Sequence, residues 1–140
     1  MTEAKVVKSI AADADAVFAL LGDFAGIKVG GPIEAVVYEG EGIGMVRTLT
    51  MNGGSVVERL ETHDPAAREF SYAILNDDSP LPFSNYSASV KVVDNGDGTS
   101  TVDWTGTFEP RDVPEEAAIN VATGIYAGGI KGAKIQLGVD

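Results

Sequence analysis

Residues 43–61, IGMVRTLTMNGGSVVERLE, decide the fold, because two alternating segments flank a turn that few residue types can form. Side chains alternate across a strand, so Arg47 shares a face with the apolar residues of the first segment, and Glu58 with those of the second. These apolar residues are Met45, Leu49 and Met51, then Val56 and Leu60. A two-residue turn at Asn52-Gly53 would place Arg47 directly opposite Glu58, and a turn at Gly53-Gly54 would place them diagonally. Either register lets the two charged side chains meet.

This charged pair lies on the face that alternation marks as buried. A buried charge without a partner costs several kcal/mol, so Arg47 and Glu58 are expected to pair or to line a wet cavity. One interpretation is a structural ion pair inside a solid core. We favour the other, a polar patch in an otherwise apolar ligand pocket, where such groups orient a bound molecule.

The pattern of strands continues on both sides of this hairpin, at the spacing of an antiparallel meander. The expected strands are residues 5–10, 33–38, 43–51, 55–61, 68–75, 85–93 and 99–108. Two short helices are expected after the first strand, at 14–21 and 24–28, and one long helix follows Pro114 and ends at Leu137. The sequence therefore predicts one α+β domain, residues 1–140, in which the last helix covers a curved antiparallel sheet.

Aromatic side chains mark the inner faces of the later strands. Tyr72, Tyr86, Trp104 and Phe108 fall on the same parity as the apolar residues around them. A buried phenol must find a hydrogen-bond partner, which can be a ligand or a bound water. Tyr72 and Tyr86 are therefore candidates for pocket contacts as much as for the core.

The long helix contains glycines four residues apart, at Gly124, Gly128 and Gly132, with Gly129 beside them. Each costs up to about 1 kcal/mol of helix propensity relative to alanine, so something must compensate. The two candidate reasons are a close approach of the helix to the sheet and volume left vacant above the sheet. In either case we expect an inward stripe of Val121, Ile125 and Gly129.

Composition excludes several classes of function. The 140 residues carry 10 Lys and Arg against 21 Asp and Glu, a net charge of -11 that disfavours binding to nucleic acid. With no cysteine and one histidine, thiol catalysis, disulfides and the common metal sites are not expected, and no cofactor is implied. No apolar stretch is long enough to insert into a membrane, and the polar start of the chain does not resemble a signal peptide. We therefore expect a cytoplasmic protein.

Short motifs along nearly the whole chain carry a resemblance to a known family. They are DAVF (15–18), LLGDF (20–24), GIGMVR (42–47), VERLE (57–61), SNY (84–86), WTGTF (104–108) and the closing helix. In order and spacing they resemble the START-like, or Bet v 1-like, superfamily (SRPBCC), and within it the polyketide cyclase/dehydrase and lipid transport family. The resemblance implies a helix-grip fold, in which a seven-stranded sheet wraps the C-terminal helix and leaves a hydrophobic cavity between them.

The chain is also similar, more distantly, to the plant abscisic acid receptors. That resemblance implies that Glu58 and Tyr86 line the cavity. The receptors' gate loop is replaced here by the turn at 52–54 and their latch by residues 79–83, so phosphatase binding gated by a hormone is not expected.

Three functions remain open at this stage. The favoured one is a binding or carrier protein for a small hydrophobic molecule, as a monomer or homodimer, without catalysis. Its expected ligand contacts are Arg47, Glu58, Tyr72, Tyr86, Trp104, Phe108, Val121, Ile125 and Gly129. The second is a polyketide cyclase or aromatase, in which Glu58 or a tyrosine moves protons and Arg47 stabilises enolate charge. The third is a protein-interaction module of the co-chaperone type, which uses a surface in place of a cavity.

Overall fold

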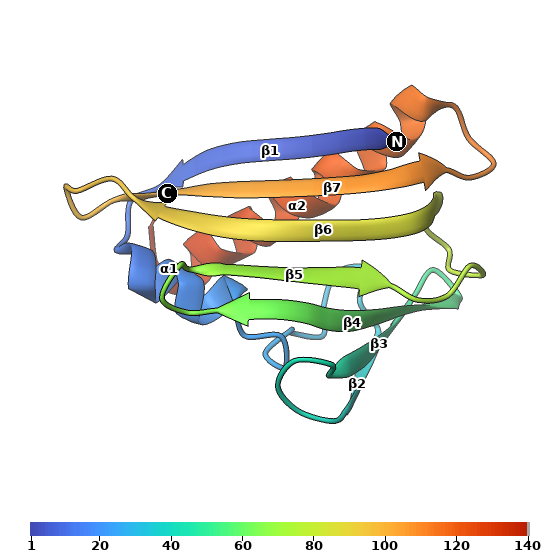
Figure 1. Ribbon diagram of the computed structural model, residues 1–140, viewed down its shortest axis with the longest axis horizontal. Helices are drawn as coiled ribbons and strands as arrows, with labels where there is room; N and C mark the ends of the chain where they lie inside the picture. Colours follow the sequence, from blue (N-terminus) through green and yellow to red (C-terminus); the bar gives the residue numbers. More distant parts are fainter. Residues whose placement is uncertain (140) are drawn as a thin grey trace.

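The computed structural model describes residues 1–139 as seven strands and two helices (Figure 1). In chain order they are β1 (Thr2–Ile10), α1 (Ala14–Leu21), β2 (Ala35–Glu39), β3 (Val46–Met51), β4 (Gly54–Asp64), β5 (Glu69–Ile74), β6 (Phe83–Asp94), β7 (Ser100–Pro110) and α2 (Glu115–Leu137). All strand pairs are antiparallel, and the sheet order is β1-β7-β6-β5-β4-β3-β2. The strands from β2 to β7 thus form a meander, and β1 closes its far edge beside β7.

The β3–β4 hairpin adopts the first of the two predicted registers. Asn52 and Gly53 both have positive φ, at 50° and 75°, as a two-residue hairpin turn with the twist of the sheet requires. Met51 therefore pairs with Gly54, and Arg47 lies directly opposite Glu58. The turn chemistry of two residues thus sets the register that brings the charged pair together.

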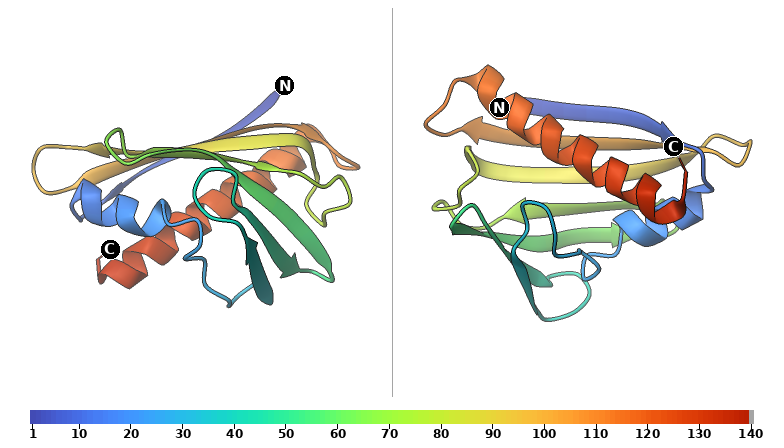
Figure 2. Two further views of the ribbon diagram at one scale, coloured as in Figure 1. Left: turned by 60° about the horizontal axis from the view of Figure 1, so that its bottom comes forward. Right: turned by 180° about the vertical axis from the view of Figure 1, so that it is seen from behind.

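Helix α2 runs diagonally across one face of the sheet (Figure 2). It begins after Pro114, carries Glu115 and Glu116 in its first turn and ends at Gly138, which has φ 71°. It packs mainly against β1 and also contacts α1 and β7. The strands β2, β3 and β4 lie further along the sheet, away from this contact (Figure 2). The molecule is therefore a helix-grip fold of one sheet and one long helix.

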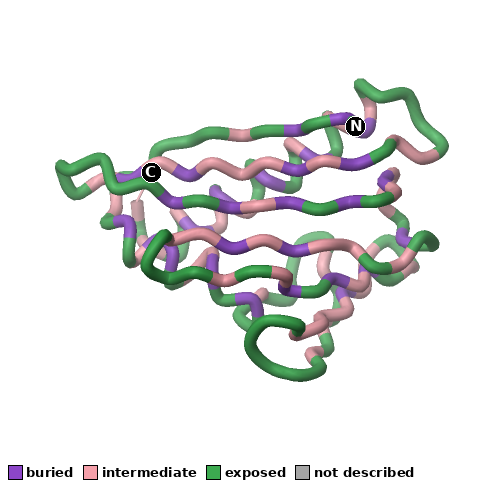
Figure 3. Tube along the Cα trace, viewed as in Figure 1, coloured by how far each residue is buried: buried purple, intermediate pink, exposed green. Residues whose placement is uncertain are grey.

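Burial alternates along the strands as the sequence predicts (Figure 3). Tyr72, Tyr86 and Phe108 are buried, and Trp104 is half-buried against the core. Two irregularities, between Leu60 and Thr62 in β4 and between Ser84 and Ser87 in β6, interrupt the ladders. Bulges of this kind bend the strand and increase the local twist.

The structure departs from the predicted helices in two details. Residues 24–28 do not form a second short helix: after α1 the described chain makes a single turn, in which the Gly26 N–H donates to the Asp23 carbonyl at 3.0 Å. Glycines at 22 and 26 lower the helix propensity of this segment, and residues 27 and 28 do not extend the turn into a helix.

The predicted inward stripe of α2 is also displaced. The residues of α2 that are buried are Ala118, Ala122, Tyr126, Ile130 and Ala133. Val121 and Ile125 are 39% and 40% exposed instead. Small alanines let the helix axis approach the sheet closely, and this approach selects the buried face over the larger apolar side chains beside it.

Candidate functional site

The larger of two cavities beside α2 lies between this helix and the β3–β4 hairpin and has a volume of about 710 Å³. Leu49 and Val56 come from the strands, and Val121 and Ile125 come from the facing side of α2. Ile27, Pro32 and Ile33 from the segment between α1 and β2 complete the wall, with Met51, Asn52, Leu81 and Asn120. The wall is largely apolar, and its volume lies within the range of small-molecule sites.

Arg47 and Glu58 are the charged side chains in this wall. Arg47 Nε donates to Glu58 Oε1 at 2.8 Å, and the two side chains are only 12% and 9% exposed. Arg47 Nη1 also donates to the Phe24 carbonyl at 3.1 Å, and the guanidinium carbon lies 3.9 Å from the centroid of the Phe24 ring. These partners fix the position of the largely buried guanidinium. Removal of one partner of a buried ion pair costs about 3–5 kcal/mol.

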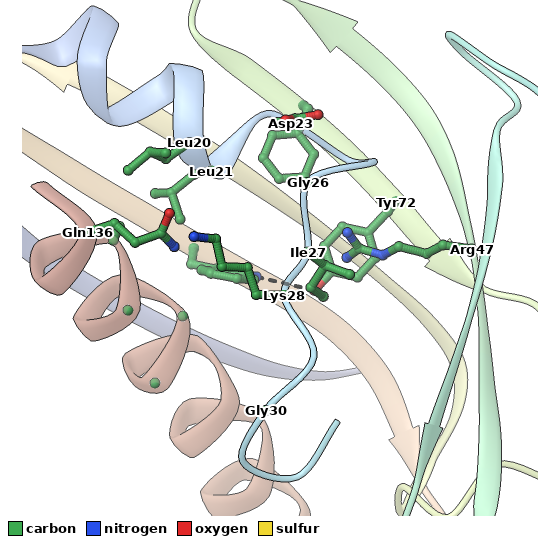
Figure 4. A pocket seen from close by; sticks show the side chains of 16 residues that line it. Leu20, Leu21, Asp23, Gly26, Ile27, Lys28, Gly30, Arg47, Tyr72 and Gln136 are labelled. Atoms are coloured by element: carbon green, nitrogen blue, oxygen red, sulfur yellow. Dashed lines mark hydrogen bonds between the residues drawn. The ribbon is translucent and has the colours of Figure 1, made fainter. Parts of the chain in front are cut away.

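A second cavity of about 370 Å³ adjoins the larger one (Figure 4). It is bounded by α1 residues Leu20 and Leu21, by Lys28 of the following segment and by Gln136 of α2. The two cavities share Ile27, Arg47, Tyr72, Trp104, Gly128 and Gly129. Figure 4 shows the Arg47 side chain extending toward the Tyr72 ring, and both residues belong to the wall that the two cavities share.

Three tyrosine hydroxyls form a buried hydrogen-bonded chain that begins at Tyr72 and continues away from the cavities. The Trp104 Nε1–H donates to the Tyr72 hydroxyl at 3.3 Å, Tyr72 and Tyr86 are hydrogen-bonded at 3.1 Å, and Tyr86 and Tyr126 at 2.6 Å. Burial raises the pKa of Tyr126 to about 12. Burial likewise raises the pKa of Tyr72 and of Tyr86, with smaller contributions from Glu58 on Tyr72 and from the neighbouring tyrosines on Tyr86. At neutral pH these phenols are therefore hydrogen-bonding groups that keep their protons, which counts against a tyrosine as general base.

The expected ligand contacts divide into two groups. Seven of them line the larger cavity: Arg47, Glu58, Tyr72, Trp104, Val121, Ile125 and Gly129. Tyr86 and Phe108 line neither of the two cavities, and both are buried beside Phe83 in an aromatic cluster with ring centroids 4.5–6.0 Å apart. Tyr86 is hydrogen-bonded to the wall residue Tyr72 but does not reach the cavity itself. Strand parity predicts which face of the sheet a side chain is on, but it does not predict whether that part of the face is covered by packed side chains or by a cavity.

The glycines of α2 satisfy both of the expected reasons. A Cβ at Gly124, Gly128 or Gly132 would meet no atom within 4 Å, so these positions open onto space. A Cβ at Gly129 would lie 2.7 Å from Trp104 Cζ3, so this position is a close approach of helix to sheet. All four glycines lie in the wall of at least one cavity.

One residue at the centre of this region escaped sequence reasoning. Tyr126 is fully buried, stacks on Trp104 with ring centroids 5.0 Å apart and ends the tyrosine chain. Its hydroxyl occupies the space that a side chain at Gly106 of β7 would need. The spacing of Tyr126 from Ala118 and Ala122 at i, i+4 and i+8 was the available signal, but alanine contributes little to a hydrophobic pattern.

Within residues 1–139 there is no group of three or more His, Cys, Asp or Glu side chains able to hold a metal ion. In the same part of the chain, neither helix combines the length and the apolar character that crossing a membrane requires.

A curved seven-stranded sheet around a long C-terminal helix defines the class of Bet v 1-like helix-grip proteins. The family model described as polyketide cyclase/dehydrase and lipid transport matches residues 1–137, and the chain belongs to this family. No curated protein matches the chain significantly.

Solved structures show the same fold. The protein XoxI from Bacillus cereus is 31% identical, with a TM-score of 0.84 over 97% of this chain and 95% of that one. Norcoclaurine synthase from Thalictrum flavum, in complex with dopamine and hydroxybenzaldehyde, is 16% identical, with a TM-score of 0.76 over 96% and 86%. Ara h 8.0201 is 19% identical, with a TM-score of 0.75 over 94% of each chain. The last two likenesses concern the fold alone.

Proposed function

We propose that this protein binds a small hydrophobic molecule in the larger cavity, as a carrier or binding protein. The observation that carries the proposal is a cavity of about 710 Å³ with an apolar wall and a single charged pair, Arg47 and Glu58. Apolar side chains of such a wall contribute affinity by removing ligand surface from water, and the few polar groups fix orientation. Membership of a family described by lipid transport as well as by cyclases and dehydrases supports this type of ligand.

The other two functions have less support from the geometry. A cyclase would use Glu58 or a tyrosine for proton transfer, but Glu58 Oε1 is engaged by Arg47 and the buried phenols keep their protons at neutral pH. An interaction module would need a contiguous exposed apolar surface. The most exposed apolar side chains, such as Val37, Ile43 and Ile135, come instead from β2, from the segment before β3 and from the end of α2.

The proposed ligand would enter beside α2. Val121 and Ile125 are exposed to solvent and also line the larger cavity, and Gly124 and Gly128 lie between them and the solvent-facing side of the helix. Because these two glycines have no side chains, they do not block access to the cavity from this side of the helix.

A substitution that fills the cavity tests the proposal. Gly128 faces both cavities and has open space at its Cβ position, so Gly128→Leu places an isobutyl group in the volume proposed for the ligand. We expect it to weaken binding of the neutral apolar dye Nile red by at least about tenfold. Ala127→Leu is the matched control, since Ala127 is the exposed neighbour of Gly128 and lines neither cavity.

Fluorescence titration gives both affinities, and native mass spectrometry gives the number of bound molecules. Equal Nile red affinity in Gly128→Leu, Ala127→Leu and the wild type would show that the dye binds elsewhere and would refute the cavity as the site. Failure of the wild type to bind the dye would count against the whole proposal.

A further inference from the structure

The buried tyrosine chain has one more proton than it can use internally. Tyr72, Tyr86 and Tyr126 each carry one hydroxyl proton, and two hydrogen bonds join the three hydroxyl groups. One hydroxyl proton is therefore left without a partner inside the chain. Which tyrosine carries it depends on the direction of the two bonds.

Burial decides between the three arrangements that are available. If Tyr72 donated to Tyr86 and Tyr86 to Tyr126, the unused proton would lie on Tyr126, which is fully buried and has no other hydrogen-bond partner within residues 1–139. If Tyr72 and Tyr126 both donated to Tyr86, the unused proton would lie on Tyr86, whose partners in that same part of the chain are these two hydroxyls. Both arrangements leave a buried donor unsatisfied, which is unfavourable.

The third arrangement places the unused proton at the cavity wall. Tyr126 then donates to Tyr86, and Tyr86 donates to Tyr72. Tyr72 lines both cavities, whereas Tyr86 and Tyr126 line neither. This direction is the only one of the three in which a bound molecule or a water can accept the remaining proton.

The same direction makes Tyr72 a donor only. A phenol oxygen accepts two hydrogen bonds, and in this arrangement Tyr72 accepts one from Tyr86 and one from the Trp104 indole N–H. Its oxygen has no remaining capacity for a donor on a ligand. The adjacent Arg47 also offers donors alone, and its positive charge is already matched by Glu58 at 2.8 Å.

We propose that the Tyr72 hydroxyl donates to an uncharged acceptor oxygen of the cavity ligand, such as a ketone or ester carbonyl, and that Tyr86 and Tyr126 are positioning residues that direct this donor. A ligand carboxylate fits less well, because it would add a second negative charge near Glu58. The inference rests on the proposed function, since it assumes that a ligand occupies the cavity. The raised pKa values of all three tyrosines agree with it, because each phenol then keeps its proton over the neutral pH range.

The test uses two neutral aminonaphthalene dyes that differ in one group: prodan, which carries a ketone, and dimethylaminonaphthalene, which lacks it. Infrared spectroscopy of bound prodan reports directly on its carbonyl, because a hydrogen bond lowers the carbonyl stretching frequency. The variants are Tyr72→Phe, Tyr86→Phe and Tyr126→Phe. Tyr38→Phe is the matched control, since the Tyr38 hydroxyl donates to the Ile27 carbonyl and is not part of the hydrogen-bonded tyrosine chain.

In the wild type we expect a carbonyl frequency below that of prodan in alkane solution. Tyr72→Phe should raise this frequency and weaken prodan binding about tenfold relative to the dye without a ketone. Tyr126→Phe and Tyr86→Phe should raise it partway, because each removes a polarising hydrogen bond behind the donor. Tyr38→Phe should leave both measurements unchanged.

The outcomes separate the inference from the function on which it rests. If both dyes bind but the carbonyl frequency is the same in the wild type and in Tyr72→Phe, the donor assignment is wrong and the cavity function stands. A wild-type carbonyl frequency equal to that in alkane also overturns the assignment, without reference to any variant. If neither dye binds the wild type, the cavity function itself fails.

Discussion

The two halves of the sheet contain the same alternation of apolar residues, but one half packs against α2 and the other faces a cavity. In the closed half, made of β1, β6 and β7, α2 packs against β1 and β7, and Phe108 and Tyr126 are fully buried. In the open half, made of β2, β3 and β4, Leu49 and Val56 face Val121 and Ile125 of the helix across a cavity of about 710 Å³. An inward-facing residue thus becomes core or cavity wall according to how closely the helix approaches it.

Small residues explain the difference between the halves. Ala118 and Ala122 of α2 are buried on the closed side, where small side chains let the helix approach the strands, and Gly106 of β7 leaves room there for the Tyr126 hydroxyl. Figure 2 shows α2 crossing the sheet apart from the β3–β4 hairpin. The larger cavity lies in the space between the helix and this hairpin.

Alkaline pH should destabilise the buried tyrosine chain most strongly. An unfolded tyrosine loses its proton near pH 10, whereas burial holds the protons of Tyr72, Tyr86 and Tyr126 to higher pH in the folded protein. Their contribution to stability is thus complete below about pH 9 and is lost as pH rises above about 10. The free energy of unfolding should fall by up to about 4 kcal/mol per pH unit there.

Urea denaturation at a series of pH values measures this loss, and tyrosinate absorbance shows when the phenols ionise. We expect the absorbance of these three tyrosines to rise together with unfolding. Ionisation of all the tyrosines near pH 10 in a protein that is still folded would show that water reaches the chain.

A matched pair of valines compares the two halves directly. Val102 of β7 and Val56 of β4 are both fully buried, but Val102 belongs to the packed core and Val56 lines the larger cavity. Val102→Ala should lower the free energy of unfolding by about 2–3 kcal/mol, and Val56→Ala by about 1 kcal/mol, because Val56 has fewer packed neighbours to lose. Urea denaturation gives both values, and equal losses would mean that the open half is packed as tightly as the closed half.

Adjacent glycines of α2 should respond with opposite signs and with the smallest effects. Gly128→Ala adds a methyl group in open space and should raise the free energy of unfolding by about 0.5–1 kcal/mol through helix propensity. Gly129→Ala should lower it by about 1–2 kcal/mol, because its methyl group meets a Trp104 ring held by Tyr126 and Tyr72. Thermal and urea denaturation measure both, and a shared sign would contradict the assignment of one glycine to space and the other to contact.

Much of the fold and part of the site follow from local patterns in the sequence. Alternation placed Arg47 and Glu58 on one face, and the Asn52-Gly53 turn then brought them together at 2.8 Å. Such a pair is predictable because strand parity and turn type are set by neighbouring residues. Its use in ligand binding stays a prediction.

The other parts of the site depend on contacts between distant segments. The face that α2 buries is set by how the helix approaches the sheet, which the helix sequence alone does not specify. Val121 and Ile125 were therefore predicted inside, whereas they are partly exposed at the edge of the cavity. The fit of the Tyr126 hydroxyl over Gly106 joins residues of two elements and leaves no local signal. Lys28 and its neighbours line the smaller cavity from a segment that has no regular period.

The three open glycines of α2 also bear on how this protein could diversify. Gly124, Gly128 and Gly132 lie over the cavities, while the contacts that hold α2 to the sheet are made by other residues on another face of the helix. A single mutation at one of the three can reshape a cavity without disturbing these contacts, and it brings a gain in helix propensity. If the larger cavity binds a ligand as proposed, ligand preference and folding stability depend on separate positions of one helix, and natural selection can change the first while the second is retained.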